Sequence, residues 1–392
     1  MAASKQTRVF DVVVVGAGVI GLSCAWRAAR EGLEVCVVEA RRPGAGASGV
    51  AAGMLAPVGE ASFGEEVLLD LNSASLGLWP EFASELEAAS AKSCGYLPLG
   101  AIHVALDGDE SSELRRSLAL HERSGLTSRW LSAAECRELE PGLSPSLAGG
   151  ILAEGEAAVD PGQTVEALVA ALHAESVDPL VEREVAALET GGESLQLTLS
   201  DGTAIRAQQL VVAAGAWSPL LDWLPPTAHP PIRPVKGQIV ELGPLPGASR
   251  VCERIVCGER FYAVPRDDGR LVVGATVEER GYDDSVTAGG VFELLREAYR
   301  ALPELAELSF VGAGAGLRPT TPDNAPVIGR VADHPAVIFA CGHFRNGILL
   351  APITADLVSD LLVGREPRVA LAPFDPSRFG QTDRQVPLGA EQ

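Results

Sequence analysis

The strongest constraint on the fold of this chain is a glycine pattern between two apolar stretches near its start. Residues 9–15 form an almost continuous run of apolar, mostly β-branched residues, as expected for a parallel strand buried on both faces. Gly16-x-Gly18-x-x-Gly21 follows and opens an apolar-periodic segment that predicts a helix. Residues 34–39 repeat the buried-strand pattern. This order of strand, glycine-rich turn, helix and strand within about 30 residues predicts a βαβ unit that binds a dinucleotide.

An acidic residue ends the second predicted strand, where the dinucleotide motif needs one. Glu39 lies 18 residues beyond Gly21, close to the usual spacing of about 20. The glycines let the backbone approach a pyrophosphate at the positive end of the helix, and the carboxylate accepts hydrogen bonds from ribose hydroxyls. A glycine-rich turn followed by an incidental acid is the alternative, and the motif does not distinguish NAD from FAD. The predicted contacts with the dinucleotide are Gly16, Ala17, Gly18, Val19, Ile20, Gly21, Glu39 and Ala40.

The charge of the chain is strongly negative. Its 392 residues carry a formal net charge of −21 at pH 7. A field of this sign repels phosphate backbones, so we expect no nucleic-acid partner. An anionic substrate would need a local cluster of arginines to bind against this field. The length is enough for two domains, or for one large α/β unit with an insertion.

Seven cysteines are scattered along the chain, and their number is odd. The closest pair, Cys252 and Cys257, has no histidine at zinc-ligand spacing beside it. We therefore expect reduced thiols in a reducing compartment, without disulfides and without a metal site. The first residues lack the apolar core of a signal peptide, and glycines interrupt the apolar stretch 12–26. A cytoplasmic protein that does not span a membrane is the expectation.

The remaining pattern predicts a second domain inserted into the first. Helical periodicity begins at residues 65 and 109, and alternating strands dominate between residues 237 and 274. Buried-strand character returns at 337–340, before a final apolar helix. The predicted fold class is α/β with an α+β insertion: a Rossmann-like nucleotide-binding domain built from separate stretches, and a second domain with an antiparallel sheet. We assign residues 1–75, 152–224 and 310–375 to the first domain, 76–151 and 225–309 to the second, and 376–392 to a loose tail.

Several further motifs occur in an order characteristic of one group of flavoenzymes. They are Gly46-Ala-Ser-Gly-Val-Ala-Ala-Gly-Met-Leu-Ala-Pro57, Val235-Lys-Gly-Gln238, Tyr262-Ala-Val-Pro-Arg266, Leu271-Val-Val-Gly-Ala-Thr276, Gly316-Leu-Arg-Pro319, Thr321-Pro-Asp323 and Gly342-His-Phe-Arg-Asn-Gly-Ile-Leu-Leu350. They cover nearly the whole chain, and residues 65–135 match least distinctively. The chain therefore resembles the amine and amino-acid oxidases of the D-amino-acid oxidase superfamily, and within it looks most like the glycine oxidases of the thiamine pathway. The resemblance implies that the dinucleotide is FAD and that the fold is of the D-amino-acid oxidase type.

The resemblance also implies which residues contact the cofactor. Small residues at 46–53 allow backbone amides to lie against a flavin ring, although this stretch taken alone also fits a flexible linker. The strand that contains Val185 falls where the adenine contact belongs. The segment 343–349 leads into the last helix, whose positive end would face the flavin edge where negative charge gathers on reduction. The implied contacts are Ala47, Ser48, Ala52, Gly53, Met54, Val185, Ala214, Gly215, His343, Phe344, Arg345, Asn346, Gly347, Ile348 and Leu349.

Two arginines and a tyrosine are implied to bind the substrate. Arg318 and Arg345 would grip a carboxylate from two different segments, because a bidentate arginine–carboxylate pair is short and charge-assisted. Tyr262 would add a hydrogen bond from its phenol. The alternative for either arginine is a structural ion pair with an acid such as Asp323 or Asp356. A strand tyrosine often serves packing alone.

The resemblance implies an oxidase that needs little acid–base machinery. A clamped amino acid would present its α-hydrogen to the flavin, and the amine lone pair would push a hydride across to give an imino acid. Oxygen would reoxidise FAD with release of hydrogen peroxide, and the imine could supply thiazole synthesis. We nominate no catalytic side chain. Sarcosine oxidases tether flavin through a cysteine where this chain reads Gly316-Leu-Arg318, so non-covalent FAD is expected.

Other functions stay open at this point. A lysine that sarcosine oxidases use for oxygen activation has no evident counterpart at 270–274, which leaves the electron acceptor open. A D-amino-acid or N-methyl amino-acid dehydrogenase would instead pass its electrons to a carrier. Some FAD-dependent tRNA-modifying domains use the same fold, but the charge of −21 argues against that function. A nucleotide-binding protein without turnover would also carry these motifs. The partners implied by the resemblance are a small amine, oxygen and further copies of the chain in a homotetramer.

Overall fold

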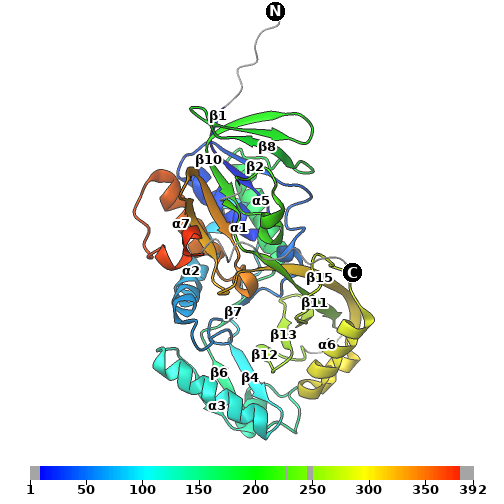
Figure 1. Cartoon of the computed structure of the whole chain (residues 1–392). Helices are drawn as coiled ribbons and strands as arrows, with labels where there is room; N and C mark the ends of the chain where they lie inside the picture. Colours follow the sequence, from blue (N-terminus) through cyan, green and yellow to red (C-terminus); the bar gives the residue numbers. More distant parts are fainter. Residues whose placement is uncertain (1–8, 226–227, 245–249, 380–392) are drawn as a thin grey trace, which may run out of the picture.

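Two large β-sheets organise the chain and occupy the upper and lower halves of Figure 1. The computed structural model describes residues 9–225, 228–244 and 250–379. Within these ranges the upper sheet has seven strands and the lower sheet has eight. The glycine motif directly follows β1 of the upper sheet, whose central strands run parallel. The predicted fold class, α/β with a second sheet that is mainly antiparallel, is confirmed.

The upper sheet joins strands from the beginning, the middle and the end of the chain. Its strands are β1 (Val9–Val15), β2 (Val35–Val38), β8 (Val185–Glu189), β9 (Leu195–Leu199), β10 (Ala204–Val212), β16 (Val327–Val331) and β17 (His334–Cys341). The order is β16–β17–β10–β1–β2, and both β1 and β17 run parallel to β10. The hairpin of β8 and β9 extends the sheet by antiparallel pairing with the start of β10. The carboxyl ends of β1, β10 and β17 therefore meet at one edge.

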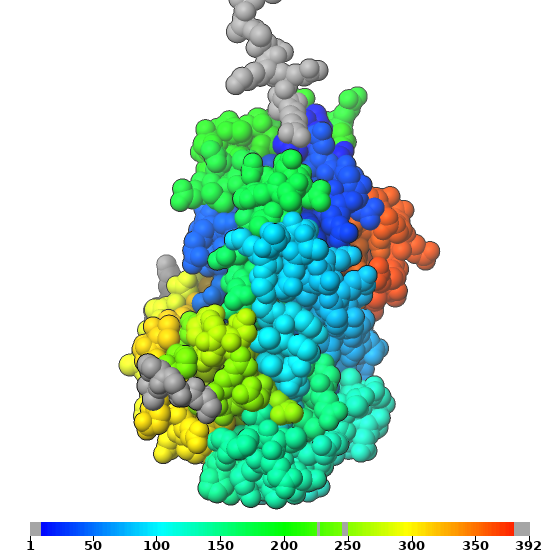
Figure 2. Space-filling model, turned by 180° about the vertical axis from the view of Figure 1, so that it is seen from behind, coloured from blue at the N-terminus to red at the C-terminus, as the bar shows by residue number. Residues whose placement is uncertain are grey.

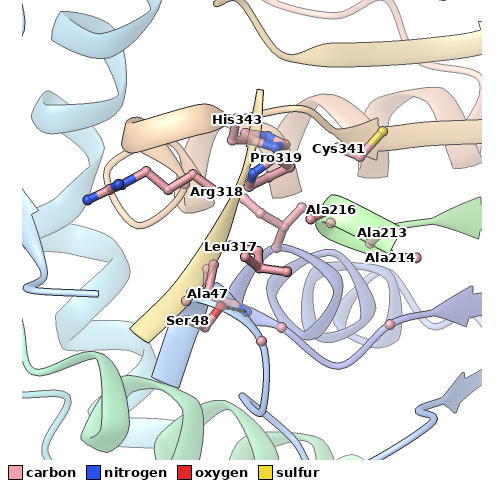
Figure 3. Close-up of a pocket in the computed structure, with 18 of the residues that line it drawn as sticks. Ala47, Ser48, Ala213, Ala214, Ala216, Leu317, Arg318, Pro319, Cys341 and His343 are labelled. Carbon is pink, nitrogen blue, oxygen red and sulfur yellow. Dashed lines mark hydrogen bonds between the residues drawn. The ribbon is translucent and has the colours of Figure 1, made fainter. Parts of the chain in front are cut away.

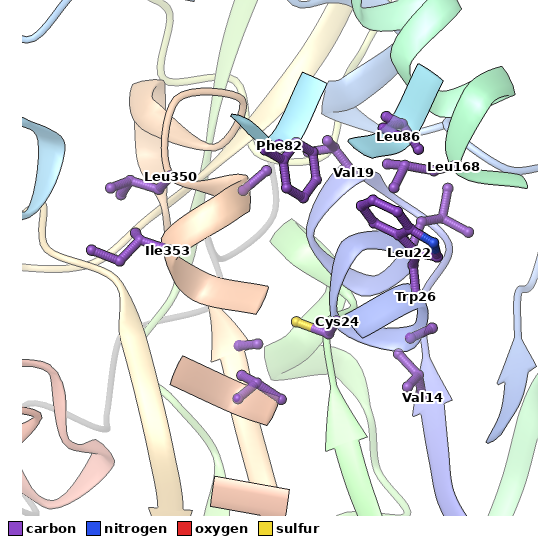
Figure 4. Packing of buried hydrophobic residues seen from close by; sticks show 14 of the residues in the cluster. Val14, Val19, Leu22, Cys24, Trp26, Phe82, Leu86, Leu168, Leu350 and Ile353 are labelled. Carbon is purple, nitrogen blue, oxygen red and sulfur yellow. The ribbon is translucent and has the colours of Figure 1, made fainter. Parts of the chain in front are cut away.

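Helices cover one face of the upper sheet. They are α1 (Val19–Arg30), α2 (Glu66–Ser90), α5 (Pro161–Ala174) and α7 (Ala351–Val363). Val14 of β1 points into the core that these helices form with the sheet, whereas its neighbours Val13 and Val15 point into a second core on the opposite face. Trp26 of α1 meets Phe82 of α2 edge to face, with ring centroids 5.4 Å apart (Figure 4). Because both faces of β1 are buried, its sequence is almost uniformly apolar.

The lower sheet has the order β15–β11–β14–β13–β12–β4–β6–β5. Its strands are β4 (Ala101–Ala105), β5 (Arg129–Leu131), β6 (Gly149–Ala153), β11 (Arg233–Gly243), β12 (Ile255–Cys257), β13 (Tyr262–Pro265), β14 (Leu271–Gly274) and β15 (Ser309–Thr320). Every neighbouring pair is antiparallel except β12 and β4, which are parallel. The accompanying helices are α3 (Gly108–Arg123), α4 (Ala133–Leu139) and α6 (Ala288–Ala301), and a separate short ladder joins β3 (Met54–Leu55) to β7 (Ala157–Ala158). Figure 2 shows α2 down the middle of the reverse face, between the two halves.

Helix starts follow the capping signals in the sequence. Ser132 and Glu135 form a reciprocal capping box at the start of α4. The carboxylate of Asp160 accepts a hydrogen bond from the amide of Gln163, and Pro161 is the first residue of α5. These local signals place α5 beside α1 and α2, where it completes the core under the nucleotide-binding sheet.

The predicted domain boundaries do not all coincide with the elements. The boundary at residue 75 divides α2, and Trp79 and Phe82 beyond it pack in the core of the upper sheet. The boundary at 310 falls inside β15, which pairs along its whole length with β11 of the lower sheet. At these two points the structure corrects the predicted division. The apolar face of α2 packs in the core of the upper sheet, and β15 is hydrogen-bonded to β11 of the lower sheet. The rest of the division stays a prediction.

The predicted loose tail is ordered at its beginning. Residues 376–378 form a short 3₁₀ turn, Arg378 pairs with Asp323 at 2.8 Å, and Phe379 is buried. The remainder of the predicted tail, 380–392, lies outside the described residues. Among the helices in the described ranges, none combines the length and the apolar character needed to cross a membrane.

Candidate active site at the meeting of the two sheets

A cavity of about 620 Å³ lies where the carboxyl ends of β1, β2, β10 and β17 meet the lower sheet. Its other walls come from β11, β13 and β15, and from the segments around residues 46–54 and 343–348. In Figure 3 residues 317–319 of β15 lie between His343 and the turn of Ala47 and Ser48. Ligands of open α/β sheets bind at the carboxyl ends of parallel strands, so this cavity is the candidate active site.

Most of the residues predicted to bind a cofactor or substrate line this cavity. They are Gly16, Gly18, Val19, Ile20, Glu39, Ala40, Ala47, Ser48, Ala52, Gly53, Met54, Val185, Ala214, Gly215, Tyr262, Arg318, His343, Phe344, Arg345, Asn346, Gly347 and Ile348. Ala17, Gly21 and Leu349 do not line it. Ala17 and Leu349 are buried, and Gly21 packs against the backbone of Gly16. The individual contacts of all these residues with ligands stay predictions.

The glycine motif brings the start of α1 against the end of β1. Gly16 has φ +105°, and a Cβ atom there would overlap the carbonyl of Ala213. A Cβ atom on Gly21 would overlap the carbonyl of Gly16. Helix and strand therefore approach closely, and the amino end of α1 borders the cavity. Its positive partial charge suits a pyrophosphate.

Glu39 is held in place at the same end of the cavity. Its carboxylate accepts hydrogen bonds from the backbone amides of Ala17, at 2.7 Å, and Arg41, at 2.8 Å. An ionised carboxylate has about four acceptor positions, so two remain for other donors. This is the arrangement that ribose hydroxyls require.

The small-residue segment is fixed by a buried arginine. The guanidinium of Arg266 donates to the carbonyls of Ala52 and Val159, both at 2.8 Å, and its Nε lies 3.8 Å from Asp160. Gly53 between them has φ +74°, and a Cβ atom there would overlap the carbonyl of Val159. Ser48, in the turn before this segment, accepts a hydrogen bond at 3.0 Å from the amide of Val19 at the start of α1. These contacts present residues 46–54 to the cavity as a rigid wall.

The C-terminal segment of the site is anchored by α2 and α7. The carbonyl of Leu349 accepts hydrogen bonds from Ser75, at 2.6 Å, and from the indole of Trp79, at 2.9 Å. His343 is buried and lies 3.0 Å from the hydroxyl of Thr354 through its Nε2. Burial lowers the pKa of His343 to about 3, so the imidazole is neutral at ordinary pH. It is therefore poorly suited to act as a general base near neutral pH, in line with its predicted role as a backbone contact.

Arg318 and Tyr262 meet at the other end of the cavity. One terminal nitrogen of Arg318 donates to the carbonyls of Thr276, at 3.1 Å, and Lys236, at 3.4 Å. A Cβ atom on Gly237 would overlap the guanidinium, which therefore lies directly against β11. Burial raises the pKa of Tyr262, although the Arg318 guanidinium opposes that shift. The pair thus offers a neutral phenol and unused guanidinium donors, as carboxylate binding requires.

Arg345 has a partner within the cavity wall. Its Nε lies 3.0 Å from the carboxylate of Glu60, and the side chains of both residues line the cavity. The acids considered from the sequence are paired elsewhere: Asp323 with Arg378 at 2.8 Å, and Asp356 with Arg27 at 3.1 Å. The predicted alternative of a structural ion pair is therefore realised with a different acid.

Several cavity residues were missed by the sequence reasoning. Glu60 lies in the turn after the small-residue segment, and Arg183 and Trp217 come from other loops. The guanidinium of Arg41 stacks over the Trp217 ring at 4.7 Å. Trp217 lies two residues after Gly215, a predicted cofactor contact, and this proximity was the available signal for it. Glu60 carried no local signal, because its partner lies far along the chain.

One cysteine side chain borders the cavity. Cys341 lines the cavity, and burial raises the pKa of its thiol to about 12. All seven cysteines are buried. In the part of the chain that the structure describes, no group of three or more His, Cys, Asp or Glu side chains could hold a metal ion.

Comparison with known proteins assigns the family. Residues 11–361 match the family model described as "FAD dependent oxidoreductase". The chain belongs to this family. The cofactor is FAD, and the cavity fits it: the dinucleotide motif, Glu39 and the small-residue segment all line it, and Ser48 joins this segment to the start of α1.

Individual relatives place the chain among oxidoreductases of the glycine oxidase type. It is 32% identical to the glycine oxidase of Geobacillus kaustophilus over 95% of this chain and 98% of that protein. A crystal structure of glycine oxidase from the same organism has a TM-score of 0.89 at 31% identity, covering 95% of this chain and all of that one. The bifunctional protein ThiO/ThiG of Trichormus variabilis is 34% identical over 96% of this chain. This chain spans 56% of that bifunctional protein.

Proposed function

We propose that this FAD-dependent oxidoreductase oxidises glycine, other small amines and D-amino acids to their imines, with oxygen as the electron acceptor. The observation that carries the proposal is that Tyr262 of β13 and Arg318 of β15 line the same cavity as the dinucleotide motif. A guanidinium and a neutral phenol match a carboxylate, and a substrate anchored there would project its amine into the cavity.

The proposed reaction needs orientation and exclusion of water more than acid–base catalysis. FAD supplies hydride acceptance when bound. The α-carbon of glycine would lose a hydride and the amine a proton, which leaves a C=N bond that water hydrolyses to glyoxylate and ammonia. Oxygen would take up the two electrons and two protons as hydrogen peroxide. The chain's part is to hold the carboxylate at Arg318 and Tyr262 while small residues at 46–54 leave room for the ring.

Non-covalent FAD belongs to the same proposal. The raised pKa of Cys341 keeps that thiol protonated and therefore a poor nucleophile. Gly316-Leu317-Arg318 places an arginine, and no cysteine, on the cavity side of β15.

The proposed setting is the supply of an imine for thiazole synthesis in the thiamine pathway. Support comes from the likeness to the ThiO part of the bifunctional ThiO/ThiG proteins. The odd number and scattered positions of the cysteines fit a reducing cytoplasm. A homotetramer is proposed from the resemblance to glycine oxidases alone.

Glycine turnover by the purified yellow protein tests this function. Anaerobic addition of glycine should bleach the flavin absorbance band, and admission of air should restore it with one hydrogen peroxide per oxygen consumed. A panel of sarcosine, D-alanine and D-proline in the same assay ranks the substrates. Absence of bleaching with every amine would refute the proposal.

The second candidate is a dehydrogenase that passes electrons to a carrier. The missing lysine counterpart at residues 270–274 is the observation that favours it. Bleaching by glycine without oxygen uptake, followed by rapid reoxidation with an artificial quinone, would select the dehydrogenase.

A further inference from the structure

The ion pair between Arg345 and Glu60 stands inside the candidate active site. The Nε of Arg345 lies 3.0 Å from Glu60, and the Phe344 ring lies 5.2 Å below the guanidinium. These are the contacts of this guanidinium among the described residues. The side chain of Arg345 keeps 43% of its surface exposed, and the atom paired with Glu60 is Nε, which leaves the two terminal nitrogens as donors for another group. An arginine that presents unused donors to a cavity is an anion subsite.

Glu60 is presented to Arg345 by a rigid turn. The amide of Glu60 donates to the carbonyl of Ala56 at 3.1 Å. The preceding amide, that of Gly59, donates at 2.8 Å to the carboxylate of Glu156, which is 1% exposed. A Cβ atom on Gly59 would overlap the ring of His103, so the turn packs closely on β4. Glu60 therefore does not rely on a flexible loop to reach the cavity.

The Glu60 carboxylate also acts on the neighbouring carboxylate site. Its charge is close enough to Tyr262 to contribute to the raised pKa of that phenol, whereas Arg318 lowers it. Glu60 thus lies within electrostatic reach of both arginine sites. A ligand with one carboxylate is held by Arg318, but a second carboxylate has to compete with Glu60 for Arg345 and is repelled by it.

We propose that Arg345 is a second anion subsite that Glu60 occupies, and that Glu60 thereby selects amines with one carboxylate over amines with two. This inference rests on the proposed amine-oxidising function. Removing the charge of Glu60 vacates the subsite and extends the substrate class to dicarboxylic amines. We expect the preference for a ligand with two carboxylates to rise about tenfold or more, because one hydrogen bond between charged groups contributes about that much affinity.

Binding of an unreactive ligand pair tests the subsite without turnover. Malonate and its half-amide, malonamate, differ by one charge, and calorimetry gives the dissociation constant of each for the FAD-loaded enzyme. Glu60→Gln should raise the ratio of the malonamate dissociation constant to the malonate dissociation constant about tenfold above its wild-type value. Glu66→Gln removes the same charge six residues further along, at an exposed position outside the cavity, and should leave the ratio unchanged. An unchanged ratio in Glu60→Gln, or an equal change in both variants, overturns the proposal.

A double variant identifies Arg345 as the recipient of the second carboxylate. Glu60→Gln with Arg345→Met should lose the gain in malonate preference, and persistence of the gain would overturn the assignment to Arg345. D-aspartate and D-asparagine form the matching substrate pair, and Glu60→Gln should raise the ratio of their kcat/KM values by a similar factor. A gain in binding without a gain in this ratio overturns the extension to substrates. If the wild-type enzyme oxidises no amine, the proposed function fails while the malonate ratio still decides the subsite.

Discussion

At the residue scale, Arg318 is both anchored and available to a ligand. Backbone carbonyls hold one part of its guanidinium, and its other N–H groups remain as donors. One terminal nitrogen is fixed by Thr276 and Lys236. The planar fork is therefore oriented before a ligand arrives, which lowers the entropy lost on binding. Lysine at this position would keep the charge but not the fork.

Replacing Arg318 tests this geometry. We expect Arg318→Ala to raise the KM for glycine roughly 10- to 100-fold, because hydrogen bonds to a charged group are lost. Arg318→Lys should fall between the wild type and the alanine variant. Steady-state peroxide formation measures KM, and Arg116→Ala, on the exposed side of α3, is the control. Unchanged KM with retained FAD would contradict the carboxylate assignment.

His343 makes the stability of the protein depend on pH. Its folded-state pKa of about 3 lies below the unfolded value of about 6.5, so the unfolded chain binds the extra proton between these limits. Stability from this group is present above pH 6.5 and is lost as the pH falls. Between pH 7.5 and pH 5 the loss is about 2 kcal/mol.

A glutamine variant isolates that contribution. His343→Gln should lose about 2 kcal/mol less free energy of unfolding than the wild type over this pH interval, as measured by urea unfolding at both pH values. The exposed His173 provides the control substitution, His173→Gln. Parallel pH profiles for wild type and His343→Gln would show that the imidazole is not held neutral.

At the residue scale, the sequence can locate a residue that belongs to a local motif. Glu39 and the glycines at 16, 18 and 21 belong to one continuous βαβ unit, so spacing alone locates them. The partner of Arg345 could not be found in this way. Glu60 and Arg345 are far apart in the sequence and are brought together by tertiary packing, so no short-range sequence pattern indicates their ion pair.

At the scale of elements, the wall formed by residues 46–54 depends on a strand of the other sheet. Arg266 follows the end of β13, and its guanidinium fastens Ala52 and Val159 at once. The small-residue segment that lines the cavity is therefore positioned by a residue that follows a strand of the lower sheet.

Loss of the two Arg266 hydrogen bonds should weaken cofactor binding while the chain still folds. Arg266→Met leaves two buried carbonyls without donors, at a cost of about 1–3 kcal/mol each, and we expect roughly tenfold weaker FAD binding. Fluorescence titration of the apoprotein measures the affinity, and circular dichroism follows the fold. Arg250→Met also removes an arginine that donates to a backbone carbonyl, that of Asp267, but away from the cavity, and should bind FAD normally. Equal FAD affinity in both variants would assign Arg266 to general stability.

Element-level prediction was accurate for buried strands and inaccurate for the edges of domains. The apolar runs of β1, β2 and β17 are buried on both faces, and this pattern is visible in sequence. β15 contains five glycines and alanines in a row at 312–316, so its sequence does not say which sheet it joins. Its pairing with β11 depends on contacts between segments far apart in the sequence.

For the whole molecule, the position of the cavity predicts how a ligand stabilises the fold. One end of the cavity belongs to the upper sheet and the other end to the lower sheet. A ligand that spans it links the two, and saturation to 100 times the dissociation constant adds about 2.7 kcal/mol to the free energy of unfolding.

Hydrogen exchange can report separately on ligand binding at the two ends of the cavity. FAD added to the apoprotein should slow amide exchange in both β10 and β11, whereas AMP, which matches only the nucleotide end, should slow exchange in β10 alone. The variant Glu39→Ala should need a higher concentration of either ligand for the same protection. Protection of β11 by AMP, or of β10 alone by FAD, would contradict the spanning arrangement.

The insertion of β17 beside β10 has a consequence for biogenesis. Translation delivers β1 and α1 long before the segment 340–348, which also lines the cavity. A ribosome-bound chain halted between these points has the glycine motif but lacks one wall of the cavity. Cofactor capture should therefore wait until this segment has been made, and a chain that stops before it should be colourless despite an intact glycine motif.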